Sequence, residues 1–136
     1  MRFEAGITIR ATPGAIWEAV SDPETWPRWT EAVHRVKKLS EGPLGVGARF
    51  RITIMCIVPV WLHMTVTEFL PGERVAMEGK ALLGRTTRYY ELRPLIGGTR
   101  AVAGGEARGP LAPVAWLVGQ VLSNEIVQAL KMRMEG

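Results

Sequence analysis

The segment FEAGITIRATPGAIWEAVSDPETWPRW (residues 3–29) determines how the predicted fold begins. Apolar and polar side chains alternate over residues 3–10, which is the pattern of a strand with one covered face. Thr12 is a typical helix N-cap and Pro13 fits a first helical turn, so we expect a helix to follow. Pro27 limits any further helix to a short one. The segment therefore predicts a strand followed by two short helices.

The rest of the chain predicts strands and then one long helix. Residues 33–108 contain short apolar runs separated by glycine and proline, and turns such as PGE (71–73) and IGG (96–98) indicate hairpin connections. Residues 109–136 predict a helix whose first half is apolar nearly all round, whereas an ordinary surface helix has one apolar stripe. The predicted order is one strand, two short helices, six strands and a long helix.

The composition is that of one globular domain spanning residues 1–136. Apolar residues make up 47% and charged residues 22%, which excludes general disorder. The single cysteine excludes an internal disulfide. We find neither a signal-peptide pattern at the N-terminus nor a run of ~20 apolar residues for a membrane span, so we expect a cytoplasmic protein.

The net charge of +4 permits anionic partners. The basic residues are scattered, however, and only HRVKK (34–38) and KMRM (131–134) are locally basic. Neither stretch carries interleaved aromatic residues. Nucleic-acid binding is therefore not expected.

Four segments carry a resemblance to a known family. They are ITIRATPGAIWEAVSDPETWPRW (7–29), GPLGVGARFRI (42–52), TEFLPGERVAM (67–77) and YELRPLIGGTR (90–100). In order and spacing they resemble the START-related helix-grip superfamily (SRPBCC), particularly its polyketide cyclase/dehydrase and lipid-transport-like family. The resemblance covers nearly the whole chain. It implies a curved antiparallel sheet gripping a long C-terminal helix, with an apolar cavity between them, and it implies ligand binding more firmly than catalysis.

The residues support the same α+β architecture on physical grounds. A seven-stranded antiparallel sheet with one apolar face must be covered, and the C-terminal helix is the only element of sufficient length. A curved sheet around one helix encloses space, and ligand pockets typically measure about 300–1,000 Å³. We expect that space to be lined, or filled, by the apolar side chains Ile54, Met64, Met77 and Trp116.

The stretch IMCIVPVWLHM (54–64) surrounds Pro59 with apolar residues, although a turn normally lies in water. In an up-and-down sheet this turn, the turn at 81–85 and the link at 108–116 lie at one end, and all three are apolar. We expect a cavity mouth there, formed by Ile57, Val58, Trp61, Leu83, Leu111 and Leu117. The same surface could meet a membrane or a homodimer partner, or simply belong to the core.

Arg88 and Tyr90 are the predicted polar residues of the site. They share a strand face with Leu92, so if Leu92 points inward they do too. A buried arginine needs a carboxylate or an anionic ligand, and Glu78 and Glu106 are the candidate partners within the chain. The alternative is that Arg88 extends to water at the nearby turn.

The sequence contains few other residues that could bind a metal or act in catalysis. His34 and His63 are the only histidines and Cys56 the only cysteine, and their spacing fits neither a metal site nor a catalytic triad. If Met64 faces the cavity, His63 faces out. We expect neither a metal nor a cofactor.

The sequence thus predicts a protein that binds a hydrophobic small molecule, such as a lipid, a polyketide-like or an isoprenoid compound. Arg88 and Tyr90 would orient the head of the ligand. One alternative is a cyclase or dehydratase that acts on a polyketide-like substrate in the same cavity. Another is an interaction module whose apolar mouth docks a protein or a membrane.

Overall fold

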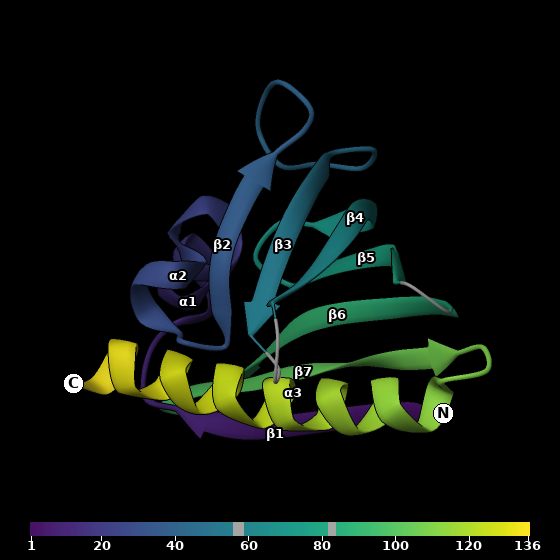
Figure 1. Ribbon diagram of the computed structural model, residues 1–136. Coiled ribbons are helices and arrows are strands. Elements are labelled where there is room, and N and C mark those ends of the chain that lie inside the picture. The colour runs from purple at the N-terminus through teal and green to yellow at the C-terminus, as the bar shows by residue number, and fades with distance from the viewer. Residues whose placement is uncertain (56–58, 82–83) are drawn as a thin grey trace.

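The computed structural model describes residues 1–55, 59–81 and 84–136 of the chain. The strands are β1 (Arg2–Ile9), β2 (Val33–Lys38), β3 (Arg49–Met55), β4 (Pro59–Leu70), β5 (Arg74–Ala81), β6 (Gly84–Leu95) and β7 (Gly98–Arg108). The helices are α1 (Pro13–Val20), the 3₁₀ helix η1 (Pro23–Thr25), α2 (Trp26–Trp29) and α3 (Ala112–Glu135) (Figure 1). The predicted order of elements is confirmed.

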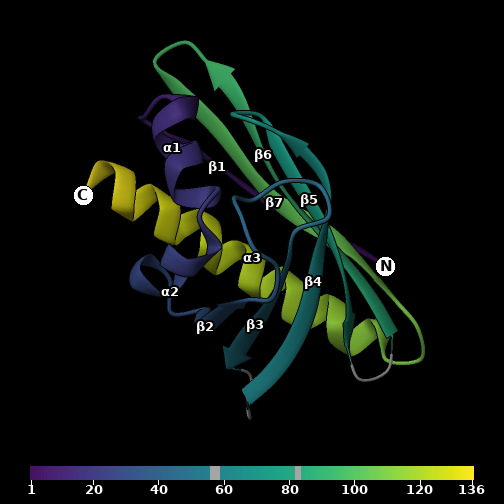
Figure 2. The ribbon, with the colours of Figure 1, turned by 90° about the horizontal axis from the view of Figure 1, so that it is seen from above.

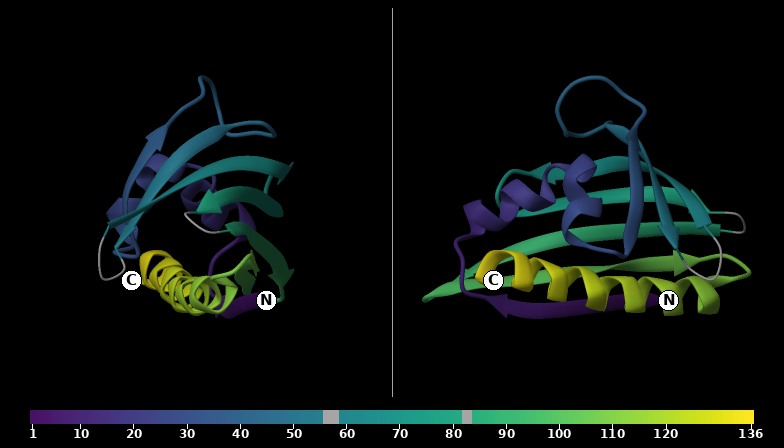
Figure 3. Two further views of the ribbon diagram at one scale, coloured as in Figure 1. Left: turned by 45° about the vertical axis from the view of Figure 1, so that its right-hand side comes forward. Right: turned by 60° about the vertical axis from the view of Figure 1, so that its left-hand side comes forward.

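The strands form one antiparallel sheet in the order β1-β7-β6-β5-β4-β3-β2. The sheet is strongly curved, and α3 lies on its concave side along β1 and β7 (Figure 3). The short helices α1 and α2 lie on the same side, near the C-terminal half of α3 (Figure 2). A pairing irregularity between Val66 and Glu68 favours the curvature, because a bulge bends the strand. The predicted α+β helix-grip fold is confirmed.

The start of α1 follows the expected capping pattern. The Thr12 hydroxyl accepts a hydrogen bond from the backbone N–H of Ala15 at 3.3 Å, and Pro13 is the first helical residue. Ile16 and Val20 then face the core. Both the hydrogen bond at its N-cap and the burial of its apolar face therefore stabilise α1.

Side chains of α3 fasten that helix to the free edge of β1. Trp116 and Lys131 donate to carbonyl oxygens of β1, and Gln120 bonds both backbone groups of Glu4. These contacts provide hydrogen-bond partners for backbone groups at the edge of β1, which would otherwise be available to pair with another chain. They also fix the position of α3 along the sheet. Among the described helices, none is long and apolar enough to cross a membrane.

The strand ends that flank three predicted connections lie at one end of the sheet, as the sequence predicts. β4 begins at Pro59, β5 ends at Ala81, β6 begins at Gly84 and β7 ends at Arg108, just before α3 begins (Figure 2). Pro59 is the first residue of its strand, a position where a missing N–H donor is tolerated.

Candidate functional site

The concave face of the sheet is apolar and faces α3. Ile54, Met64, Met77 and Tyr90 are all buried in the main core cluster, which also contains buried residues of α3. They come from four neighbouring strands, β3 to β6. The structure thus brings together four of the six predicted ligand-binding residues, and in this structure their side chains pack against the core.

Arg88 joins the same face, next to Met77 on the neighbouring strand. Only 6% of its surface is exposed. Its guanidinium donates to the hydroxyl of Ser123 on α3 at 3.2 Å, and it lies 5.6 and 5.8 Å from the ring centroids of Phe3 and Tyr90. Arg88 therefore points inward, as its parity with Leu92 predicts, instead of extending to water.

The two candidate partners of Arg88 bind other arginines. Glu78 pairs with Arg85 at 3.4 Å, and Glu106 pairs with Arg108 at 2.9 Å. Over residues 1–55, 59–81 and 84–136, no carboxylate lies within ion-pair distance of Arg88. The described partners of the positively charged guanidinium are thus one hydroxyl group and two aromatic rings.

Aromatic side chains connect this face to the short helices. The Trp26 ring meets Phe50 and Tyr90 edge-on, with ring centroids 5.9 and 5.6 Å apart. Its indole N–H donates to the carbonyl of Val20 at 3.2 Å. Trp26 is therefore the centre of the packing between α1, α2 and the sheet.

Trp116, the sixth predicted ligand-binding residue, lies apart from the other five. Its indole N–H donates to the backbone of Arg2 at the edge of β1, and its side chain is half-buried. Trp116 therefore forms a contact between α3 and the edge of β1.

The predicted mouth residues divide into two groups. Ile57, Val58 and Leu83 lie outside the described residues. Trp61 is 62% exposed, on the face of β4 opposite Met64, and Leu117 of α3 is 58% exposed. Leu111 is exposed at the start of α3. The described mouth residues are thus at the surface, and none of them belongs to the core.

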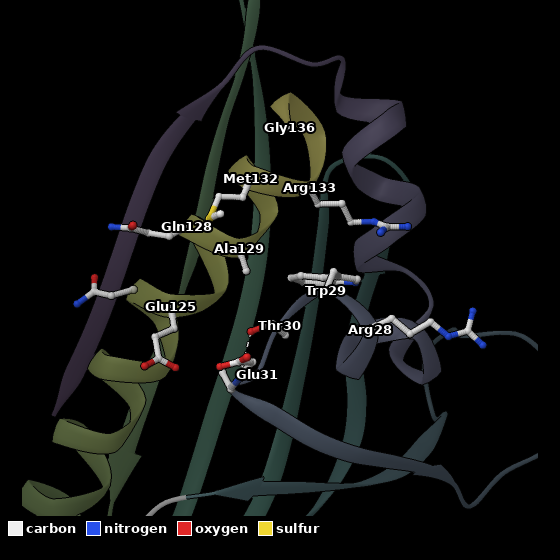
Figure 4. A pocket seen from close by; sticks show the side chains of 12 residues that line it. Arg28, Trp29, Thr30, Glu31, Glu125, Gln128, Ala129, Met132, Arg133 and Gly136 are labelled. Carbon is white, nitrogen blue, oxygen red and sulfur yellow. Dashed lines mark hydrogen bonds between the residues drawn. The ribbon is translucent and has the colours of Figure 1, made fainter.

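An open cavity of about 890 Å³, most of whose lining residues are solvent-exposed, lies between α2, the start of β2 and the C-terminal half of α3. Its lining residues are Arg28, Trp29, Thr30, Glu31, Ala32, Asn124, Glu125, Gln128, Ala129, Met132, Arg133 and Gly136. Figure 4 shows Trp29 between α2 and α3, with Ala129 and Met132 on the facing helix. The cavity therefore has an apolar centre and charged residues around it.

Trp29 carries an unsatisfied polar group. Its indole nitrogen is buried and has no hydrogen-bond partner in the described part of the chain. A buried N–H without a partner costs about 1–3 kcal/mol relative to a paired one. A turn of the ring toward the cavity would offer this donor to a ligand.

Tyr89, His34 and His63 lie away from the concave face. Tyr89 lies on the opposite face of β6, and burial together with its hydrogen bond to Glu4 raises the pKa of its phenol to about 12. His34 and His63 are both exposed, as expected for His63. In the described residues, no group of three His, Cys, Asp or Glu side chains is placed to hold a metal ion.

The sequence predicts a cavity between the sheet and the long helix, but it indicates neither the position of the cavity beside α2 nor the partner of Arg88. In the sequence, neither Trp29 nor Ala129 carries a signal of a cavity wall. Ser123 is a small polar residue in an apolar stretch of α3, and that contrast is the one feature that could have marked it.

The sequence profile of the family described as "Polyketide cyclase / dehydrase and lipid transport" matches residues 1–135. The chain belongs to this family. This member of the polyketide cyclase/dehydrase and lipid transport family has the START-related helix-grip fold.

Two solved structures resemble this family member over nearly their full length. A START superfamily protein from Mycobacterium smegmatis aligns with a TM-score of 0.81 and 15% identity, over 98% of this chain and 97% of that one. The protein TTHA0849 from Thermus thermophilus aligns with a TM-score of 0.83 and 16% identity, over 99% and 97%. At this level of identity the likeness shows the fold alone.

The curated relatives match over a shorter stretch. Uncharacterized proteins of Mycobacterium bovis and Mycobacterium tuberculosis are 33% identical over 45 residues, which is 33% of this chain and 27% of each relative. The matched stretch thus spans about a quarter of these relatives.

Proposed function

We propose that this protein binds and carries a hydrophobic small molecule between the concave face of its sheet and α3. The ligand would be a lipid, a polyketide-like or an isoprenoid compound. Membership of a family described by polyketide chemistry and lipid transport supports hydrophobic ligands as a class. The apolar concave face supports the same choice.

The observation that carries this proposal is the cavity between α2, β2 and α3, which adjoins the apolar interior at Trp29 and Ala32. Its volume of about 890 Å³ falls within the usual range of small-molecule sites. Its buried wall residues Thr30 and Ala32 belong to the segment that leads from α2 into β2. The unsatisfied N–H of Trp29 would supply a donor for an oxygen atom of the ligand.

Burial of apolar surface would provide the affinity. Each buried methylene group contributes about 0.8 kcal/mol, so a chain of about ten carbons would contribute roughly 8 kcal/mol before the cost of association. Met64 and Met77 belong to the same core cluster as the cavity residue Ala32, and their flexible thioether chains repack easily. The interior would therefore adapt to the shape of the ligand.

Filling the cavity tests this proposal. We expect calorimetry to show that the wild-type protein binds 1-decanol at one site. Ala129→Trp should weaken binding at least about tenfold, because the added indole would exclude about two methylene groups of the ligand from the cavity. Ala15→Trp, at an exposed position of α1, is the matched control and should bind as the wild type does.

Unchanged affinity in Ala129→Trp would place the ligand outside this cavity. Absence of 1-decanol binding to the wild type would refute the proposal as a whole. Circular dichroism and thermal melting of both variants show whether each one is folded.

One observation favours an enzymatic alternative. The Arg88 guanidinium lies 5.8 Å from the ring of Tyr90, so a phenol and a cation face the same interior. A phenol can donate a proton while a nearby cation stabilises a developing oxyanion, which is the chemistry of cyclisation and dehydration. Tyr90→Phe would abolish such a reaction and leave binding largely intact.

The exposed apolar residues of α3 support a site of ligand exchange. Val114, Leu117 and Val121 follow a spacing of three and four residues, so they share one exposed face of the helix. An exposed apolar stripe is typical of a surface that meets a membrane or another protein. We favour a membrane surface, from which a hydrophobic ligand would enter, and a second copy of the chain is the alternative.

A further inference from the structure

Arg88 is a buried cation whose charge is only partly compensated. A guanidinium stays protonated in proteins and offers several N–H donors in a planar fork. One described hydrogen bond, to Ser123, and two aromatic faces accompany it. Isolated buried charges are expensive, and neutral partners offset only part of that cost. The site therefore favours a negatively charged group beside the guanidinium.

The acidic residues on the neighbouring strands do not supply that group. Glu78 and Glu106 are each bonded to another arginine, and both are partly solvent-accessible. Glu4 accepts from Tyr89, and Glu91 pairs with Arg74 and Arg93. Within the described chain, these carboxylates thus already pair with side chains other than Arg88.

We propose that the bound molecule is an amphiphile with an anionic oxygen head group, such as a carboxylate, and that Arg88 binds this head. The inference rests on the proposed function, because it assigns the ligand class of the same interior site. The fork of the guanidinium matches the two oxygens of a carboxylate. Ser123 accepts from Arg88 through its oxygen, so its hydroxyl hydrogen is free to donate to the same anion.

The sheet-facing side of α3 beside Arg88 fits the tail of such a molecule. Ser123, Ile126 and Val127 are buried on this side, whereas the cavity residues of α3 lie on the other side of the helix. An alkyl chain that starts at Arg88 would therefore lie between α3 and the sheet. Tyr90 and Met77 would border its first carbons, because both are neighbours of Arg88.

A comparison of decanoate with 1-decanol tests the head-group assignment, because the two differ only in the head. Calorimetry at pH 8 should show that the wild type binds decanoate about 10- to 100-fold more tightly, the range expected for a charge-assisted hydrogen bond. Arg88→Met should remove this preference, because it should weaken the binding of decanoate much more than that of 1-decanol. Arg85→Met is the matched control, since Arg85 lies on the same strand with a side chain 63% exposed, and it should keep the preference.

Each other outcome has a distinct meaning. Equal binding of both compounds by the wild type, which needs no variant, overturns the anionic head group and leaves hydrophobic binding standing. Equal weakening of both compounds by Arg88→Met assigns Arg88 to packing and also overturns the inference. Binding of neither compound by the wild type refutes the proposed function itself.

Discussion

Replacing Trp26 with alanine should lower the free energy of unfolding by about 3–5 kcal/mol, the range for removing a large buried aromatic side chain. Trp26 is 3% exposed. Its ring joins Phe50 and Tyr90 of the sheet, and its N–H satisfies the carbonyl of Val20 at the end of α1. The substitution would leave a cavity and an unpaired carbonyl in the place where two helices meet the sheet.

Urea unfolding followed by circular dichroism measures this loss. Trp61→Ala is the matched control because it removes the same side chain at a 62% exposed position, and it should change stability by no more than about 0.5 kcal/mol. A loss below about 1 kcal/mol for Trp26→Ala would contradict the packing described here. Trp26→Phe, which keeps most of the ring volume, should lie between the two.

Gly105→Ala should also destabilise the protein strongly, by about 3 kcal/mol, at the upper end of the usual cost of overpacking. A Cβ atom at Gly105 would lie 1.9 Å from the carbonyl oxygen of Thr87 on β6 and 2.9 Å from the ring of Phe3. A backbone oxygen cannot move away without separating β6 from β7. The same shift would displace Phe3, whose ring stacks near Arg88.

Thermal and urea unfolding measure this effect against Gly14→Ala. Gly14 lies in α1 and a Cβ there would meet nothing within 4 Å, so this control should raise stability by about 0.5–1 kcal/mol. If Gly105→Ala unfolds at the same urea concentration as the wild type, the close approach of β6 and β7 at this position is wrong.

The fold could be predicted from sequence because local signals determine it. Alternation over residues 3–10, the cap at Thr12 and the glycine and proline turns each report on neighbouring residues. The inward direction of Arg88 followed from the same alternation, since Arg88 and Leu92 share a strand face without a bulge between them.

The candidate site was only partly predictable because it depends on contacts between distant segments. The cavity exists where Trp29 of α2 faces Ala129 of α3, and no local pattern reports how two helices approach one another. Trp116 looks like any apolar residue of α3 in the sequence. Its hydrogen bond to the edge of β1 depends on the rotation of the whole helix.

The most direct test of ligand carriage is native mass spectrometry of the freshly purified protein, followed by denaturing extraction and identification of any released compound. The account predicts a discrete adduct that is lost on denaturation and proves to be an apolar compound. A protein of unmodified mass would contradict it. If that protein were also a dimer that Leu117→Glu separates, the exposed stripe of α3 would be a contact between two chains instead of a site of ligand exchange.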